Sequence, residues 1–139
     1  MKPQILLDTG VLVALLSKAD QFNQWATTTV TTANSPLLTC EAVITEACFL
    51  LQRDSRSQQA VLSLVNRRAV QIAFCLSDEM KAIEELIARY ENVPMSLADA
   101  CLVRMAELYP ESTVLTLDSD FKIYRKNRNQ EILIIMPAR

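Results

Sequence analysis

Short apolar runs alternate along the chain with longer stretches in which hydrophobic positions recur at helical spacing. The apolar runs are too short for helices and predict buried strands at 4–7, 37–39, 69–75, 113–117 and 131–136. The stretches between them predict helices at 10–17, 20–33, 41–52, 55–67, 77–90 and 96–109. Strands that alternate with helices are typical of an α/β fold, in which helices cover both faces of a parallel sheet.

Two local patterns extend this expectation. The helix at 41–52 is apolar on nearly all sides, which predicts a buried helix. The expected order of elements also includes a helix between the strands at 113–117 and 131–136. The chain of 139 residues shows no internal repeat, low-complexity segment or interdomain linker, so we expect residues 1–139 to form a single domain.

The composition argues against several classes of enzyme. The sequence has no histidine, which disfavours hydrolases with a histidine base, histidine-based ribonucleases and the common zinc sites. Its single glycine, Gly10, disfavours glycine-rich phosphate-binding loops. The four cysteines lack C-x-x-C spacing and fit reduced thiols. Chemistry based on carboxylates and a metal ion therefore remains for any hydrolysis.

Charge and hydropathy indicate the environment of the protein. The formal net charge is -2, so any attraction for a nucleic acid must come from a local basic patch. No apolar run approaches the roughly 18 residues of a membrane-spanning helix, and the N-terminal stretch does not resemble a signal peptide. We therefore expect a soluble, cytoplasmic protein that does not associate with a membrane.

Four carboxylates each stand alone in an apolar stretch that is otherwise uncharged. They are Asp8, Glu46, Asp99 and, directly after an apolar run, Asp118. An ionised carboxylate in apolar surroundings is costly unless something pairs with it, and these stretches contain no lysine or arginine. A divalent cation shared by all four would stabilise each of them. The pattern is typical of a metal-dependent phosphodiesterase.

Each carboxylate also has a structural interpretation. Asp8 could cap the helix that follows it, and Asp99 completes a Ser-x-x-Asp capping box. Asp118 and Asp120 could form a turn after a strand, and Glu46 could pair with a distant arginine. However, ligands of parallel sheets bind at the carboxyl ends of the strands, where Asp8 and Asp118 lie. One acidic pocket explains the four positions together.

The stretches around these carboxylates resemble the four motifs of the PIN domain. They are ILLDTGVLVALL at 5–16, VITEACFLL at 43–51, SLADACL at 96–102 and VLTLDSDF at 114–121. Their order and spacing cover nearly the whole chain, whose length is similar to that of the single-domain VapC-type toxins of toxin–antitoxin pairs. The resemblance implies a three-layer α/β/α sandwich with a central parallel sheet of four to five strands, and a metal-dependent nuclease.

The same resemblance implies roles for the acids. Asp8, Asp99 and Asp118 would hold one or two Mg²⁺ or Mn²⁺ ions, for which hard oxygen ligands are suited. Glu46 belongs to the same acidic site and would hold or orient a water on the metal. Asp120 matches a frequent additional acid and would be a secondary metal ligand. The expected reaction is hydrolysis of RNA phosphodiester bonds that leaves a 5′-phosphate.

Further residues are candidates for contact with the substrate. Thr116 matches the small hydroxyl residue that often precedes the fourth acid of the family, and Thr9 is at the site by adjacency. The densest basic cluster follows Asp118 and could grip phosphates; it consists of Lys122, Arg125, Lys126 and Arg128. A second basic cluster could bind RNA or an antitoxin peptide; it consists of Arg53, Arg56, Arg67 and Arg68. Both clusters could equally be solvated surface.

Other classes of function remain open. The chain could be a PIN-fold binding module that acts without catalysis through a protein or RNA partner. It could also be a DNA nuclease, because the acids do not distinguish the two sugars. A haloacid-dehalogenase-like phosphatase would need an aspartate at position 10, which is glycine, and a receiver-like domain would need paired early acids. The resemblance implies an RNA substrate, an antitoxin protein and a homodimer as partners.

Overall fold

Five short parallel strands form the central sheet of the computed structural model, which describes residues 3–138. In their order across the sheet, they are β3 (Val70–Ile72), β2 (Leu37–Thr39), β1 (Ile5–Leu7), β4 (Thr113–Leu115) and β7 (Ile134–Ile135). None of these strands contains a charged residue, as expected for strands that are covered on both faces. The predicted parallel sheet is confirmed.

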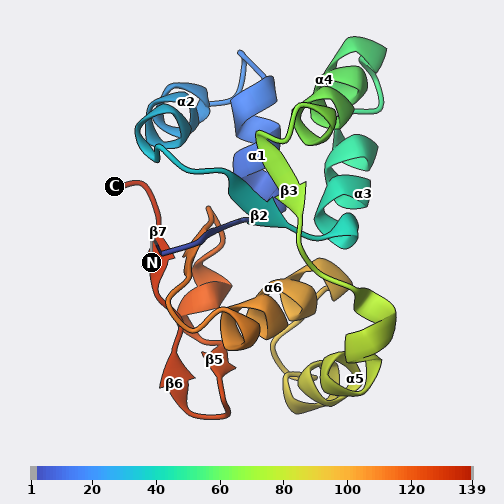
Figure 1. Cartoon of the computed structure of the whole chain (residues 1–139), viewed down its shortest axis with the longest axis vertical. Helices are drawn as coiled ribbons and strands as arrows, with labels where there is room; N and C mark the ends of the chain where they lie inside the picture. Colours follow the sequence, from blue (N-terminus) through green and yellow to red (C-terminus); the bar gives the residue numbers. More distant parts are fainter. Residues whose placement is uncertain (1–2, 139) are drawn as a thin grey trace.

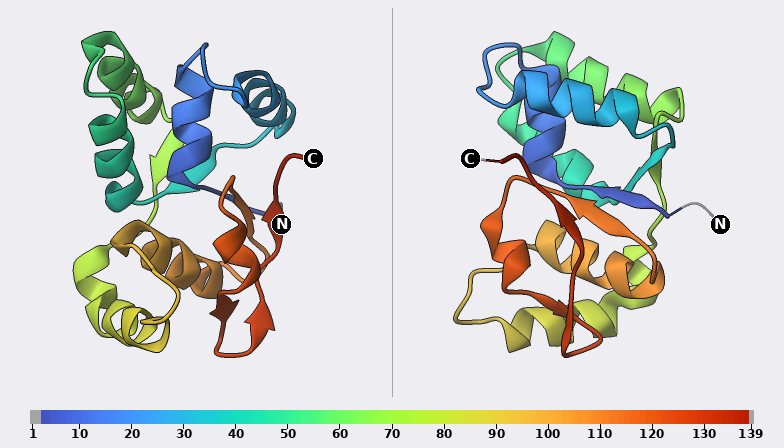
Figure 2. Two further views of the ribbon diagram at one scale, coloured as in Figure 1. Left: turned by 180° about the vertical axis from the view of Figure 1, so that it is seen from behind. Right: turned by 90° about the vertical axis from the view of Figure 1, so that its left-hand side faces the viewer.

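Helices cover both faces of this sheet (Figure 1, Figure 2). One side carries α1 (Thr9–Leu16), α2 (Asn23–Thr32), α3 (Glu41–Leu50) and α4 (Ser55–Asn66). The other side carries α5 (Met80–Arg89) and α6 (Leu97–Leu108). The three-layer α/β/α sandwich is therefore confirmed.

Helix α6 packs most deeply of the six. Its residues Ala100, Leu102, Val103 and Met105 are fully buried, and the helix contacts both β1 and β4. Its N-cap is Ser96, whose side chain accepts a hydrogen bond from the backbone N–H of Asp99. The first turn of α6 is thereby fixed beside the carboxyl ends of the two central strands.

Helix α3 differs from the expectation that it is buried on all sides. Val43 and Ala47 face the core and are fully buried, whereas Phe49 and Leu50 are 64% and 57% exposed. The prediction of an entirely buried helix was wrong, because α3 and its neighbour α4 form the outer edge of their layer (Figure 1). The exposed apolar residues lie at the C-terminal end of α3, close to the site described below.

The segment between β4 and β7 also differs from the expectation. In place of an α-helix, it forms a 3₁₀ turn (Ser119–Lys122) and an antiparallel ribbon of β5 (Arg125–Lys126) and β6 (Gln130–Glu131). The turn of the ribbon places Asn127 and Arg128 in the left-handed region, with φ of 49° and 70°. A left-handed pair of this kind matches the twist of a tight hairpin and is incompatible with a helix.

Three further expectations concern the end of a strand, the cysteines and membrane-spanning helices. Strand β3 ends at Ile72, where the apolar run predicted a strand to position 75, and a 3₁₀ turn (Leu76–Glu79) precedes α5. All four cysteines are free, with Cys40 and Cys101 in the core and Cys75 exposed. Among the described residues, no helix has the length and apolar character needed to span a bilayer.

Candidate active site

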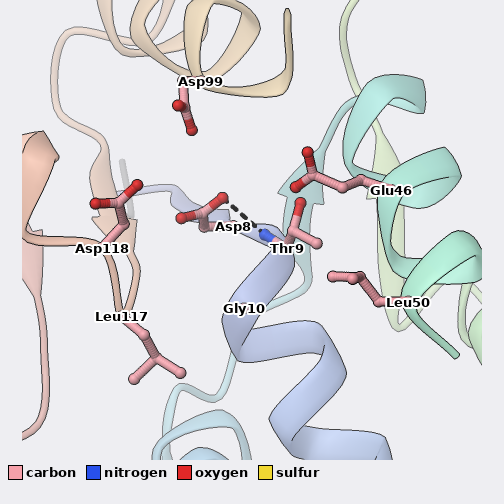
Figure 3. Close-up of a pocket in the computed structure, with 8 residues that line it drawn as sticks. All are labelled: Asp8, Thr9, Gly10, Glu46, Leu50, Asp99, Leu117 and Asp118. Atoms are coloured by element: carbon pink, nitrogen blue, oxygen red, sulfur yellow. Dashed lines mark hydrogen bonds between the residues drawn. The ribbon is translucent and has the colours of Figure 1, made fainter. Parts of the chain in front are cut away.

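An acidic hollow opens where β1 and β4 end, between the two central strands. Its volume is about 440 Å³, and its walls are formed by Asp8, Thr9, Gly10, Glu46, Leu50, Asp99, Leu117 and Asp118 (Figure 3). The strand order reverses between β1 and β4, and ligands of open parallel sheets bind at such reversals. The structure thus brings together all four carboxylates that the sequence singled out.

Asp8 forms the floor of the hollow. It follows β1, caps α1 and is only 5% exposed. One of its carboxylate oxygens, Oδ1, accepts a hydrogen bond from the backbone N–H of Thr9 at 2.7 Å, and Oδ2 accepts one from the Thr116 hydroxyl at 2.6 Å. Burial raises the pKa of Asp8 to about 6, against the lowering effect of these two bonds. Asp8 therefore both caps α1 and lines the acidic hollow.

Thr116 connects the two acids that follow the central strands. Its hydroxyl is fully buried, donates to Asp8 and accepts a hydrogen bond from the backbone N–H of Asp118 at 2.9 Å. Asp118 in turn caps the 3₁₀ turn, because its Oδ1 accepts a hydrogen bond from the backbone N–H of Asp120 at 2.9 Å. Asp120 does not itself line the hollow. Thr116 thus fixes the relative position of Asp8 and Asp118.

Asp99 reaches the hollow from the first turn of α6. Its Oδ2 accepts a hydrogen bond from the backbone N–H of Ser96 at 3.1 Å, which completes the predicted capping box. The pKa of Asp99 is raised, first by burial and then by the charges of Asp118 and Glu46. The Tyr124 hydroxyl lies 3.4 Å from Oδ2 and 2.9 Å from the carbonyl oxygen of Pro94. Tyr124 was not anticipated from the sequence, in which nothing links it to Asp99.

Glu46 enters the hollow from the middle of α3 and is half-buried. Its carboxylate points toward Thr9 and the space below Asp99 (Figure 3). The structural interpretation of Glu46 required an ion pair with a distant arginine. Within residues 3–138, the ion pairs are those that Arg104 forms with Glu79 and Glu107. The position of Glu46 is therefore explained by the hollow and not by an ion pair.

The oxygen atoms of the hollow suit a hard divalent cation. Carboxylates are the preferred ligands of Mg²⁺ and Mn²⁺, and no nitrogen or sulfur ligand competes on these walls. In the described part of the chain, no three acidic side chains lie close enough together to hold one ion without moving. Like charges repel, which accounts for carboxylates on separate elements standing apart.

Thr9 supplies an independent sign that the hollow receives a ligand. The residue is 3% exposed, and its hydroxyl oxygen has no hydrogen-bond partner among the described residues. The hydroxyl points into the hollow toward Glu46 (Figure 3). A buried hydroxyl without a partner costs about 1–3 kcal/mol, which a bound water, cation or substrate oxygen would offset. The sequence suggested Thr9 only by its adjacency to Asp8.

The predicted basic cluster after Asp118 does not line the hollow. Lys126 is buried, and its ammonium group donates to the carbonyl oxygen of Pro110 at 3.1 Å. The Arg125 guanidinium folds back onto the carbonyl oxygens of Lys122 and Ile123. The side chains of Lys122 and Arg128 are exposed. The structure therefore leaves two of the four predicted cations, and not a continuous patch, on the surface of this segment.

Comparisons with known proteins agree with this fold. The family model of the PIN domain matches residues 5–127. Ribonuclease VapC26 of Mycobacterium tuberculosis is 24% identical over 116 residues, which cover 82% of this chain and 86% of that protein.

Two solved structures share the fold. VapC20 of Mycobacterium tuberculosis, described as a Sarcin-Ricin loop cleaving toxin, superposes with a TM-score of 0.79 at 20% identity, over 86% of this chain and 94% of that one. VapBC2 of Rickettsia felis, bound to a promoter DNA fragment, gives a TM-score of 0.64 at 14% identity, over 96% and 98% of the two chains. Together with the family match over most of the sequence, these likenesses show that the chain belongs to the PIN domain family.

Proposed function

We propose that this protein is a metal-dependent endoribonuclease, the toxin of a VapC-type toxin–antitoxin pair. The observation that carries the proposal is the convergence of Asp8, Glu46, Asp99 and Asp118 in one hollow at the reversal of strand order. The activities named for VapC26 and VapC20, ribonuclease and Sarcin-Ricin loop cleavage, support RNA as the substrate.

In this proposal, the acids of the hollow have different roles in hydrolysis. Asp8, Asp99 and Asp118 are the ligands proposed for one or two Mg²⁺ or Mn²⁺ ions. Thr116 holds the Asp8 carboxylate at 2.6 Å and so orients it toward its neighbours. Glu46, on the opposite wall, orients the attacking water and accepts its proton.

When bound, such a cation would lower the pKa of a water toward neutral pH and offset the charge that develops on the phosphate. The raised pKa of Asp8, caused mainly by burial, fits a group whose ionised form is stabilised by a cation. Asp120 contributes indirectly, because its backbone N–H fixes Asp118 at 2.9 Å. We expect cleavage to leave a 5′-phosphate on the downstream fragment.

The proposal includes the partners of the protein. VapBC2 of Rickettsia felis supports an antitoxin as partner, since that structure contains a VapBC pair with promoter DNA. We also propose a homodimer in the cytoplasm. Co-expression with an adjacent small reading frame, followed by size-exclusion chromatography with light scattering, measures both assemblies.

The direct test is cleavage by the purified protein. A mixed RNA pool and single-stranded DNA are each incubated with EDTA, Mg²⁺ or Mn²⁺, with Asp8→Asn as the inactive variant. Glu84→Gln, on the exposed face of α5, removes one carboxylate away from the hollow and serves as the control. We expect RNA cleavage that requires metal, disappears in Asp8→Asn and persists in Glu84→Gln.

Three results would contradict the proposal. Cleavage of the DNA alone would make the protein a DNA nuclease. RNA binding by folded protein without cleavage in any metal would make it a PIN-fold binding module. Cleavage that persists undiminished in Asp8→Asn would place the chemistry outside this hollow.

A further inference from the structure

We propose that a basic hollow next to the acidic one binds backbone phosphates of the RNA strand that flank the cleaved bond. The basic hollow lies where α1 and α3 end and α4 begins, and it measures about 670 Å³. Lys18, Arg53 and Arg56 supply its positive charge. The inference rests on the proposed function, because it names where that function's substrate continues beyond the acidic site.

The two hollows adjoin each other at one shared side chain. Leu50, which is 57% exposed, lines both of them. A strand whose phosphate lies among the carboxylates could therefore continue across Leu50 into the basic hollow. The exposure of Leu50 was unexpected from the sequence, and a position on a path for the substrate gives it a role.

The charge of the basic hollow is not neutralised internally. Its one carboxylate, Asp54, is the N-cap of α4. The Asp54 Oδ1 accepts a hydrogen bond from the backbone N–H of Arg56 at 2.9 Å, and Oδ2 accepts one from the Ser57 hydroxyl at 3.2 Å. None of the three cationic side chains forms an ion pair within residues 3–138. Three exposed cations around one concave surface attract a polyanion.

The distribution of charge over the chain favours this location for RNA binding. The protein carries a formal charge of -2, so it has no general attraction for a nucleic acid. The basic segment after Asp118 is partly turned inward, with Lys126 buried and Arg125 bonded to backbone carbonyls. A guanidinium presents parallel donors that suit phosphate oxygens, and Arg53 and Arg56 are the arginines that the structure places beside the acidic hollow.

Helix α4 provides a matched control. Arg53→Gln with Arg56→Gln removes two charges at its N-terminal end, inside the basic hollow. Arg67→Gln with Arg68→Gln removes two charges at its C-terminal end, where both arginines are exposed and line neither hollow. The two double variants have the same net charge, so a difference between them reports position and not total charge.

Binding is measured with a fluorescent single-stranded RNA by anisotropy, in the Asp8→Asn background so that the RNA stays intact, from 50 to 300 mM KCl. Cleavage rates of the same pairs are measured with Asp8 present. For the Arg53 and Arg56 pair, we expect a Kd about tenfold higher near ~0.1 M salt and a salt slope smaller by about 1.4, the effect of losing two phosphate contacts. We expect the Arg67 and Arg68 pair to bind as the parent does.

Equal RNA binding and equal salt slopes for the two pairs would overturn the inference while leaving the nuclease intact. A fluorescent poly-glutamate peptide is the second probe. If the Arg53 and Arg56 pair loses this peptide but keeps RNA affinity, the basic hollow is a docking site for an acidic protein segment and the inference is wrong. A protein that neither binds nor cleaves RNA would refute the proposed function and this inference together.

Discussion

Replacing Asp8 by asparagine should stabilise the metal-free protein at neutral pH while abolishing its activity. Asp8 is 5% exposed and its neighbours include two other carboxylates, so its ionised form is costly in the folded state. Burial raises its pKa to about 6, whereas an aspartate in an unfolded chain titrates near about 3.9. The folded protein thus binds a proton at Asp8 more tightly than the unfolded protein does.

Proton binding at Asp8 determines how the stability of the fold depends on pH. Between about pH 4 and pH 6 the folded state holds more protons at Asp8 than the unfolded state, so the free energy of unfolding falls as the pH rises. A pKa raised from about 3.9 to about 6 corresponds to about 3 kcal/mol of folding free energy. This stabilisation is lost above pH 6 in the absence of a cation. Asparagine is neutral and recovers part of this, for which we expect about 1–3 kcal/mol.

The assay is thermal unfolding of wild type and Asp8→Asn in EDTA. A gain of 1–3 kcal/mol corresponds to roughly 3–9 °C in Tm for a protein of this size. We expect this gain at pH 7.5 and no gain at pH 4, where Asp8 of the wild type is protonated. Added Mg²⁺ or Mn²⁺ should raise the Tm of the wild type and leave that of Asp8→Asn unchanged. A lower Tm for Asp8→Asn at pH 7.5 in EDTA would refute the reasoning, since the carboxylate would then stabilise the fold.

Three other substitutions test neighbouring contacts. Thr116→Val removes the 2.6 Å hydrogen bond that lowers the pKa of Asp8. We therefore expect the acid limb of the pH–rate profile to move to higher pH, which cleavage rates from pH 5 to 9 measure. Thr9→Val removes a buried hydroxyl without a partner, so we expect an unchanged or higher Tm and cleavage about tenfold slower. Thr9→Ser keeps the hydroxyl and should cleave at the normal rate. A normal rate for Thr9→Val would exclude a role for the hydroxyl. Lys126→Met replaces a buried ammonium group, whose one acceptor is the Pro110 carbonyl oxygen, by an apolar side chain of similar length. RNA affinity measured by anisotropy should therefore not change. A marked loss of affinity would mean that Lys126 contacts the substrate.

The sequence predicted the fold because its strands are short apolar runs and its helices show hydrophobic positions at helical spacing. Strands such as β1 and β4 are covered on both faces, and α6 carries an apolar core face with a capping box at its start. The ribbon of β5 and β6 could not be predicted. Its strands are short and polar, and its turn depends on left-handed Asn127 and Arg128, which have no glycine to mark them.

The acids of the site were predictable for a related reason. A carboxylate isolated in an apolar stretch needs a partner, and the ends of parallel strands meet at one edge, so Asp8 and Asp118 could be placed together from sequence. Surface contacts carry no such signal. The inward turn of Lys126, the contact of Tyr124 with Asp99 and the exposure of Leu50 depend on tertiary packing, which no local pattern encodes.

The double use of Asp99 has a consequence for how the activity would be lost during evolution. Its carboxylate accepts the backbone N–H of Ser96 in the capping box of α6, so its replacement removes one of the two hydrogen bonds of that box, at a cost of about 1 kcal/mol, from the most deeply packed helix. Asp8 also caps a helix, α1, but its burial makes the ionised carboxylate costly, so we expect Asp8→Asn to remain folded. Where expression of the protein is toxic, cells that survive by inactivating it should therefore carry substitutions at Asp8 more often than at Asp99, and the inactive protein they retain should be folded and abundant.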